Sequence, residues 1–141
     1  MSTVTAPKEF VSSVGLVITG LSLEPLEVSE LLGVLPDSCW RKGDPKPVGQ
    51  SQYEWGGWKK RLTPRDCGDP FVPDLEQWVD LLLPKASALK QLQERGLDIA
   101  LDCFITINGA ALVEIDRTLQ RRLAELGISI SITIWAGPNV G

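Results

Sequence analysis

Residues 97–109 read LDIALDCFITING, and this stretch decides the fold class. Apolar side chains occupy every second position, which is the period of a β-strand with one buried face. They are Leu97, Ile99, Leu101, Cys103, Ile105 and Ile107. Asn108 and Gly109 then have the composition of a turn. Strict alternation is typical of a sheet that helices cover on one side only.

The closing stretch, ISISITIW at 128–135, repeats this alternation. Its isoleucines share one face, and a helix begun by Asp116 and ended by Gly127 supplies a leucine stripe to pack on them. We therefore predict one buried cluster of Ile99, Leu101, Ile105, Ile130, Ile132, Leu119 and Leu123. On the opposite, bare face we expect Ser129, Ser131, Thr133 and Asp102, either facing solvent or lining a two-fold interface.

The rest of the chain is divided by its glycines and prolines. We expect strands over 10–19, 37–42 and 51–60, and helices over 24–33, 74–83 and 85–96. The order predicts an α+β two-layer sandwich with a ferredoxin-like β-α-β-β-α-β core and an extra α-β unit. Its helices would cover one face of a mostly antiparallel sheet. We expect one domain over 10–135, with flexible tails at 1–9 and 136–141.

Composition limits the possible functions. The 141 residues are 43% hydrophobic and 23% charged, as in ordinary globular domains. The absence of histidine excludes Ser-His-Asp and Cys-His catalysis and every zinc site that needs histidine. A formal charge of −4 makes nucleic acid an unexpected partner.

The expected location is the cytoplasm. The N-terminal residues show no signal-peptide pattern, and no apolar run approaches the length of a membrane span. Cys39, Cys67 and Cys103 lie too far apart for a CxxC pair, so we expect three reduced thiols.

Residues 40–65 form the most unusual segment, with seven basic and two acidic side chains (7 − 2 = +5) against 7 − 16 = −9 elsewhere. Basic side chains beside Trp and Tyr suit a planar or anionic ligand or an acidic partner. The candidate binding residues are Trp40, Arg41, Lys42, Tyr53, Trp55, Trp58 and Lys59. Some of the rings must be core, and we expect these to be Trp40 and one of Trp55 or Trp58. The alternative is a solvated basic hairpin whose rings only pack on the core.

No catalytic group, metal or cofactor is predicted. Asp98 and Asp102 share a strand face but lie roughly 13 Å apart, too far to act as a paired acid and base. Phosphate-binding glycine loops and a GxSxG nucleophile turn are absent from the sequence.

A family resemblance appears at 22–44, SLEPLEVSELLGVLPDSCWRKGD. This stretch resembles the opening of a bacterial family called domain of unknown function 4279, in which a helix begun by Asp/Glu-Pro ends in LLG before a Pro and a Lys-Gly-Asp/Glu turn. Gly57-Trp58, the helix DLEQWVDLLLP at 74–84 and the ending LAELGISISITIW at 123–135 resemble later elements, with Trp135 where Tyr is more usual. The resemblance covers about 10–135. It implies fold and boundaries but no reaction, cofactor or catalytic residue.

Three functions remain open. We favour a small non-catalytic protein-binding or regulatory module, of the immunity or antitoxin kind, that uses the basic-aromatic face of 40–65. The alternative is a binder of a small anionic ligand or nucleotide at the same face. The third is an enzyme that relies on carboxylates and arginines alone. A homodimer through the open sheet face is a further hypothesis.

Overall fold

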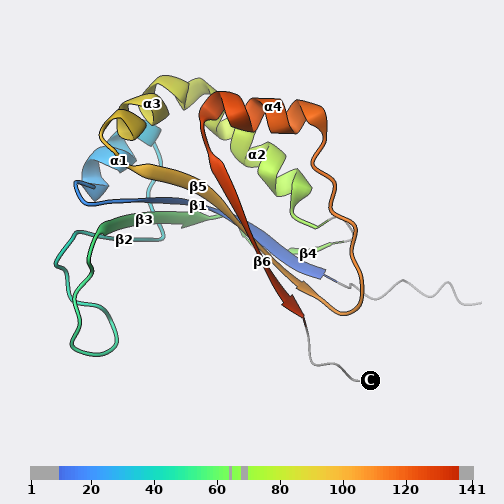
Figure 1. Cartoon of the computed structure of the whole chain (residues 1–141), viewed down its shortest axis with the longest axis horizontal. Coiled ribbons are helices and arrows are strands. Elements are labelled where there is room, and N and C mark those ends of the chain that lie inside the picture. The colour runs from blue at the N-terminus through green and yellow to red at the C-terminus, as the bar shows by residue number, and fades with distance from the viewer. Residues whose placement is uncertain (1–9, 64, 68–69, 137–141) are drawn as a thin grey trace, which may run out of the picture.

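A computed structural model describes residues 10–63, 65–67 and 70–136. Figure 1 shows two layers, with the helices gathered on one side of a single sheet. The predicted tails 1–9 and 136–141 lie outside the described residues except for Ala136, which belongs to the last strand. The elements in chain order are β1 (Phe10–Gly20), α1 (Pro25–Leu32), β2 (Ser38–Trp40), β3 (Gly56–Arg61), β4 (Arg65–Cys67), α2 (Val72–Leu82), the 3₁₀ turn η1 (Leu83–Lys85), α3 (Ala86–Glu94), β5 (Asp98–Ile107), α4 (Arg117–Leu126) and β6 (Ser129–Ala136).

The strands form a mixed sheet in the order β2-β3-β1-β5-β6, with β4 also paired to β1. β1 runs antiparallel to β3 and β5, whereas β5 and β6 are parallel. The α+β class is as expected, but the sheet is mixed rather than mostly antiparallel, because β6 runs parallel to β5. β3 lies between β1 and β2, and β1 lies between β3 and β5, so each of these two crossovers encloses an inserted strand, as in split β-α-β units. β6 follows α4 and lies directly beside β5 at the edge of the sheet.

The predicted helix boundaries have clear local causes. Pro25 occupies the first turn of α1, where its missing N–H costs nothing, and Gly33 ends the helix at φ 72°. Asp116 caps α4 because its Oδ1 accepts the Leu119 N–H at 2.8 Å. Gly127 ends α4 at φ 66°. Both left-handed positions suit glycine, which has no Cβ to clash.

The core lies between the helices and the sheet. Most of the cluster predicted from the strands and the α4 stripe is confirmed, because five of its members are less than 5% exposed; they are Ile99, Leu101, Ile105, Leu119 and Leu123. Trp58 of β3 is fully buried on this side, and its Nε1 donates to Ser29 Oγ of α1 at 3.0 Å.

The prediction that Ile132 is buried is wrong, since its exposed fraction is 46%, while Ile130 is only partly buried. The cause is the length of α4, the helix that covers β6. The ten residues of α4 span about 15 Å, whereas the eight residues of β6 extend about 26 Å. Alternation identifies the side of the strand but not how far the helix reaches along it.

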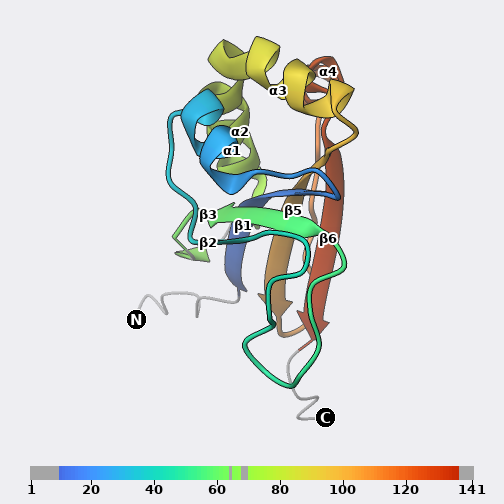
Figure 2. The same ribbon diagram turned by 90° about the vertical axis from the view of Figure 1, so that its left-hand side faces the viewer.

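The opposite sheet face carries no helix in the part of the chain that the structure describes (Figure 2). Ser129, Ser131 and Thr133 are exposed there, as predicted, and Asp102 is partly exposed. We call this side the open face. The register places Ser38, Lys59, Val17 and Ala100 in one row across it.

Candidate functional site

A tryptophan lies flat on the open face because a glycine beside it makes room. Trp40 of β2 pairs with Gly57 of β3, and a Cβ on Gly57 would meet Trp40 Cζ2 at 2.1 Å. The Trp40 Nε1 also donates to the Trp55 carbonyl oxygen at 3.0 Å. The glycine pair inside the predicted strand therefore marks a close approach, as such pairs often do.

The segment between β2 and β3 is held by a ladder of backbone bonds, and it brings Tyr53 onto Trp40. Two backbone hydrogen bonds cross the segment at Tyr53. The Gly43 N–H donates to the Tyr53 carbonyl oxygen at 2.8 Å, and the Tyr53 N–H donates to the Asp44 carbonyl oxygen at 2.9 Å. The Trp40 and Tyr53 rings stack with centroids 4.5 Å apart and planes 19° apart. Residues 51–55, predicted as strand, belong to this segment, and β3 begins only at Gly56.

Two lysines flank the stacked rings. Lys59 Nζ lies 5.3 Å from the Trp40 ring centroid, and Lys46 Nζ lies 5.7 Å from that of Tyr53. An ammonium within about 6 Å of an aromatic face is attracted by the electron-rich ring, by about 0.5–1 kcal/mol at exposed sites. The positive charges are therefore held beside the rings. We call Trp40, Tyr53, Lys46 and Lys59 the stacked site.

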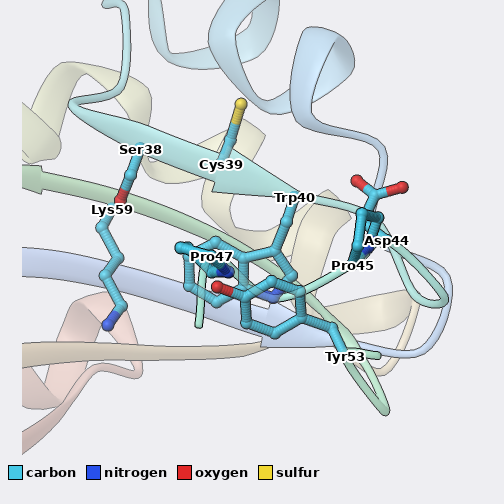
Figure 3. A pocket seen from close by; sticks show the side chains of 8 residues that line it. All are labelled: Ser38, Cys39, Trp40, Asp44, Pro45, Pro47, Tyr53 and Lys59. Carbon is cyan, nitrogen blue, oxygen red and sulfur yellow. The ribbon is translucent and has the colours of Figure 1, made fainter. Parts of the chain in front are cut away.

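The stacked site borders a hollow of about 600 Å³. Figure 3 shows Trp40, Tyr53 and Lys59 on one side of the β2–β3 pair, while Cys39 projects to the other. The lining residues, most of them exposed, are Ser38, Cys39, Trp40, Asp44, Pro45, Pro47, Tyr53 and Lys59. The hollow is consequently open to solvent rather than enclosed.

A second polar group lies further along the same face. Arg61 of β3 reaches across β1 over Gly15, where a Cβ would stand 3.2 Å from its guanidinium. The Arg61 Nη2 donates to Asp102 Oδ2 at 2.6 Å, and Nη1 donates to Ser13 Oγ at 2.8 Å. Both charged side chains are about one-third exposed. Arg61 therefore joins β3, β1 and β5 across the open face.

Three of the predicted site residues, Trp40, Tyr53 and Lys59, come together on the open face. Trp40 is half-buried there rather than part of the core, contrary to the expectation for its ring. Trp58 is fully buried on the helix side, so it belongs to the core and cannot contribute to a surface. Strand alternation explains the difference, because Trp58 and Lys59 are consecutive.

The other predicted residues lie around the stacked site. Arg41 turns toward α1, where its Nε donates to Glu24 Oε2 at 2.9 Å. This hydrogen bond, with the Glu24 charge, raises the pKa of Arg41. Lys42 is exposed, and Trp55 is half-exposed while its carbonyl holds Trp40.

Sequence reasoning placed Asp102 on this face but missed Lys46, Arg61 and the pairing of Arg61 with Asp102. Lys46 is separated from Tyr53 by a turn whose shape the sequence does not show. The signal for Arg61 was available in principle, because Gly15 interrupts a β-branched strand at the residue opposite both Arg61 and Asp102.

The cysteines and acidic residues offer little chemistry in the part of the chain that the structure describes. Cys39 and Cys103 are free thiols, while the side chain of Cys67 lies outside the described structure. Burial raises the pKa of the Cys103 thiol to about 12, so it is protonated at neutral pH. No group of three or more Cys, Asp and Glu side chains among the described residues could hold a metal ion.

The chain was compared with known proteins. A family model described as "Domain of unknown function (DUF4279)" matches residues 9–137. Neither the curated proteins nor the solved structures contain a match. None of the helices that the structure describes is long and apolar enough to cross a membrane.

Proposed function

The chain belongs to the DUF4279 family, and from this premise we propose that it is a non-catalytic binding module whose open face takes an acidic segment of a partner protein. The stacked site carries the proposal. It gathers two stacked, partly exposed rings and two ammonium groups on one surface. Aromatic and basic side chains are enriched at the centres of protein interfaces.

The shape of the hollow favours a protein segment over a small molecule. Small-ligand sites bury 70–90% of the ligand in an enclosed cleft of about 300–1,000 Å³. The hollow beside Trp40 has a suitable volume, but exposed prolines and Lys59 line it and leave it open. A partner segment that lies across the sheet would supply the missing wall.

The stacked site is also prearranged. Trp40 is fixed by Gly57 and by its bond to Trp55, and Tyr53 is fixed by two backbone bonds. Side chains that are already ordered lose less conformational entropy when a partner binds. The basic character of 40–65, in a chain that is otherwise −9, would in addition speed association with an acidic segment.

Fluorescence anisotropy with a labelled peptide of about ten alternating glutamates and glycines tests the proposal, with the corresponding lysine peptide as a negative control. We expect saturable binding at low salt that weakens as salt screens the charges. Lys59→Glu should lower affinity at least fivefold, since losing the lysine and adding a like charge costs about 1 kcal/mol or more.

Lys42→Glu is the matched control, because it makes the same charge change in the same basic segment at an exposed position outside the stacked site. It should lower affinity less than twofold. Equal losses for the two variants would mean that overall charge, and not the stacked site, attracts the peptide.

The second candidate is a small planar anion, favoured by the ring stack with an ammonium on each side. Thermal shift with adenosine monophosphate and with 4-hydroxybenzoate tests this candidate, because a ligand of the folded state raises the melting temperature. A rise that Lys59→Glu abolishes and Lys42→Glu retains would favour the small ligand over the acidic segment.

A further inference from the structure

β6 forms one edge of the sheet, and nothing in its sequence protects that edge. Its eight residues, SISITIWA, contain no charge and no proline. Natural sheets protect exposed edges with charged side chains, proline, bulges or very short strands, because an open edge pairs readily with another strand. β6 is neither short nor charged.

The opposite edge of the same sheet provides an internal comparison. β2 has only three residues, and Asp37 immediately precedes it. The Asp37 carboxylate accepts the Arg61 backbone N–H at 2.7 Å and lies 3.6 Å from Lys60 Nζ. Arg41, immediately after β2, pairs with Glu24. The β2 edge thus has the protection that the β6 edge lacks.

The C-terminal half of β6 also exposes large apolar side chains on both of its faces. Ile132 and Ile134, on the helix side, are 46% and 61% exposed, and Trp135, on the open side, is 63% exposed. Neighbouring exposed apolar groups of this size mark interaction surfaces. The edge and the apolar groups belong to one strand, so a single added strand would pair with the edge and place its own side chains beside these groups.

We propose that two copies of the chain pair through antiparallel β6 strands about a two-fold axis perpendicular to the sheet. Such an axis keeps the helix side of both copies on the same side. Opposite residues must then share a face, and the register that pairs most of β6 is centred on Ile132. Ile132 lies opposite its own copy, Ile130 opposite Ile134, and Ser131 opposite Thr133.

A second copy fits this edge because the residues that lie opposite one another are compatible. Isoleucine meets isoleucine on the helix side, Ser131 meets Thr133 and Ser129 meets Trp135 on the open side, and no like charges approach each other within the paired strands. The stacked site is at the β2 and β3 end of the sheet, away from β6. Edge pairing therefore differs from the homodimer through the open face expected from the sequence, because both open faces remain free.

Sedimentation equilibrium tests the pairing. At about 100 µM the wild type should sediment with twice the 15.4 kDa chain mass, and it should dissociate on dilution, because one strand pair lies at the low end of interface sizes. Ile132→Lys and Ile132→Glu should each be monomeric at that concentration, since each places like charges opposite one another. An equimolar mixture of the two should recover the dimer.

Leu35→Lys is the control, because it adds the same charge at a leucine that is 77% exposed near the β2 edge. It should remain dimeric, and circular dichroism should show all variants folded. A monomeric wild type overturns the proposal, and dimerisation after deletion of 137–141 would then identify that segment as the occupant of the edge. A mixture that stays monomeric, or a dimer that Ile132→Lys leaves intact, also overturns it.

Discussion

Gly57→Ala should destabilise the protein by displacing the ring of Trp40. The new methyl group would lie 2.1 Å from Trp40 Cζ2 and 2.4 Å from Cε2, far inside contact distance. The ring is the part that must move, because Gly57 is held in β3 between β2 and β1. Its movement separates Trp40 from Tyr53, from Lys59 and from the Trp55 carbonyl.

The magnitude follows from these three contacts. An offset aromatic pair contributes about 0.5–1.5 kcal/mol, a net hydrogen bond about the same, and an exposed cation–aromatic contact about 0.5–1 kcal/mol. Alanine restricts the unfolded chain and returns about 0.4–1 kcal/mol. The free energy of unfolding should therefore fall by about 1–3 kcal/mol, and binding of the glutamate peptide at the stacked site should weaken.

A double-mutant cycle isolates the cause. Urea unfolding followed by circular dichroism would compare Gly57→Ala in the wild type and in a Trp40→Ala background. Without the ring there is nothing to displace, and Gly57 is not among the glycines with positive φ, so alanine should be neutral or slightly stabilising. If Gly57→Ala costs nothing in the wild type, or costs the same in both backgrounds, the steric reasoning is refuted.

Three more predictions compare buried and exposed side chains. Ile105→Ala should cost about 2–5 kcal/mol in urea unfolding, whereas Ile132→Ala, measured at low protein concentration, should cost less than about 1 kcal/mol; equal costs would mean that β6 is covered. In the native protein at pH 8, iodoacetamide should label Cys39 but not Cys103, as mass mapping would show. Because burial raises the pKa of the Cys103 thiol from 9.0 to about 12, the folded state keeps its proton where the unfolded chain loses it. This contribution to stability, full below pH 9, should fall as the pH rises toward 12, and Cys103→Ala should remove that fall.

The regular elements could be predicted because their signals are local. The alternation of 97–107, the cap at Asp116 and the glycine stops at Gly33 and Gly127 each involve neighbouring residues, and each is found in the structure. The strand order is not determined by such local signals. It depends on which edge each crossover reaches, and β6, which follows α4, lies directly beside β5.

The sequence predicts which segment contains the site, but not how the side chains of that segment are arranged. Composition identified 40–65, and alternation alone would have separated Lys59 from Trp58, which lie on opposite faces of β3. Trp40 is expected in the core because some of the rings of 40–65 must be buried. Its position on the open face depends on contacts with Gly57 and Tyr53, which come from the other side of a turn-rich segment.

Gly57 and Gly15 have the same effect on the open face, because each leaves room for a large side chain from a neighbouring strand. Gly57 lets the Trp40 ring lie across β3, and Gly15 lets the Arg61 guanidinium lie across β1 toward Asp102. On the helix-covered face the space above a glycine would be filled by apolar side chains of the core, which surround Trp58 there. β-branched residues favour strands more than glycine does, and alanine at Gly15 would meet only the flexible end of Arg61. Strand stability alone therefore does not explain both glycines. They hold an aromatic ring and a charged group flat against the sheet, which is an arrangement suited to contact with a partner.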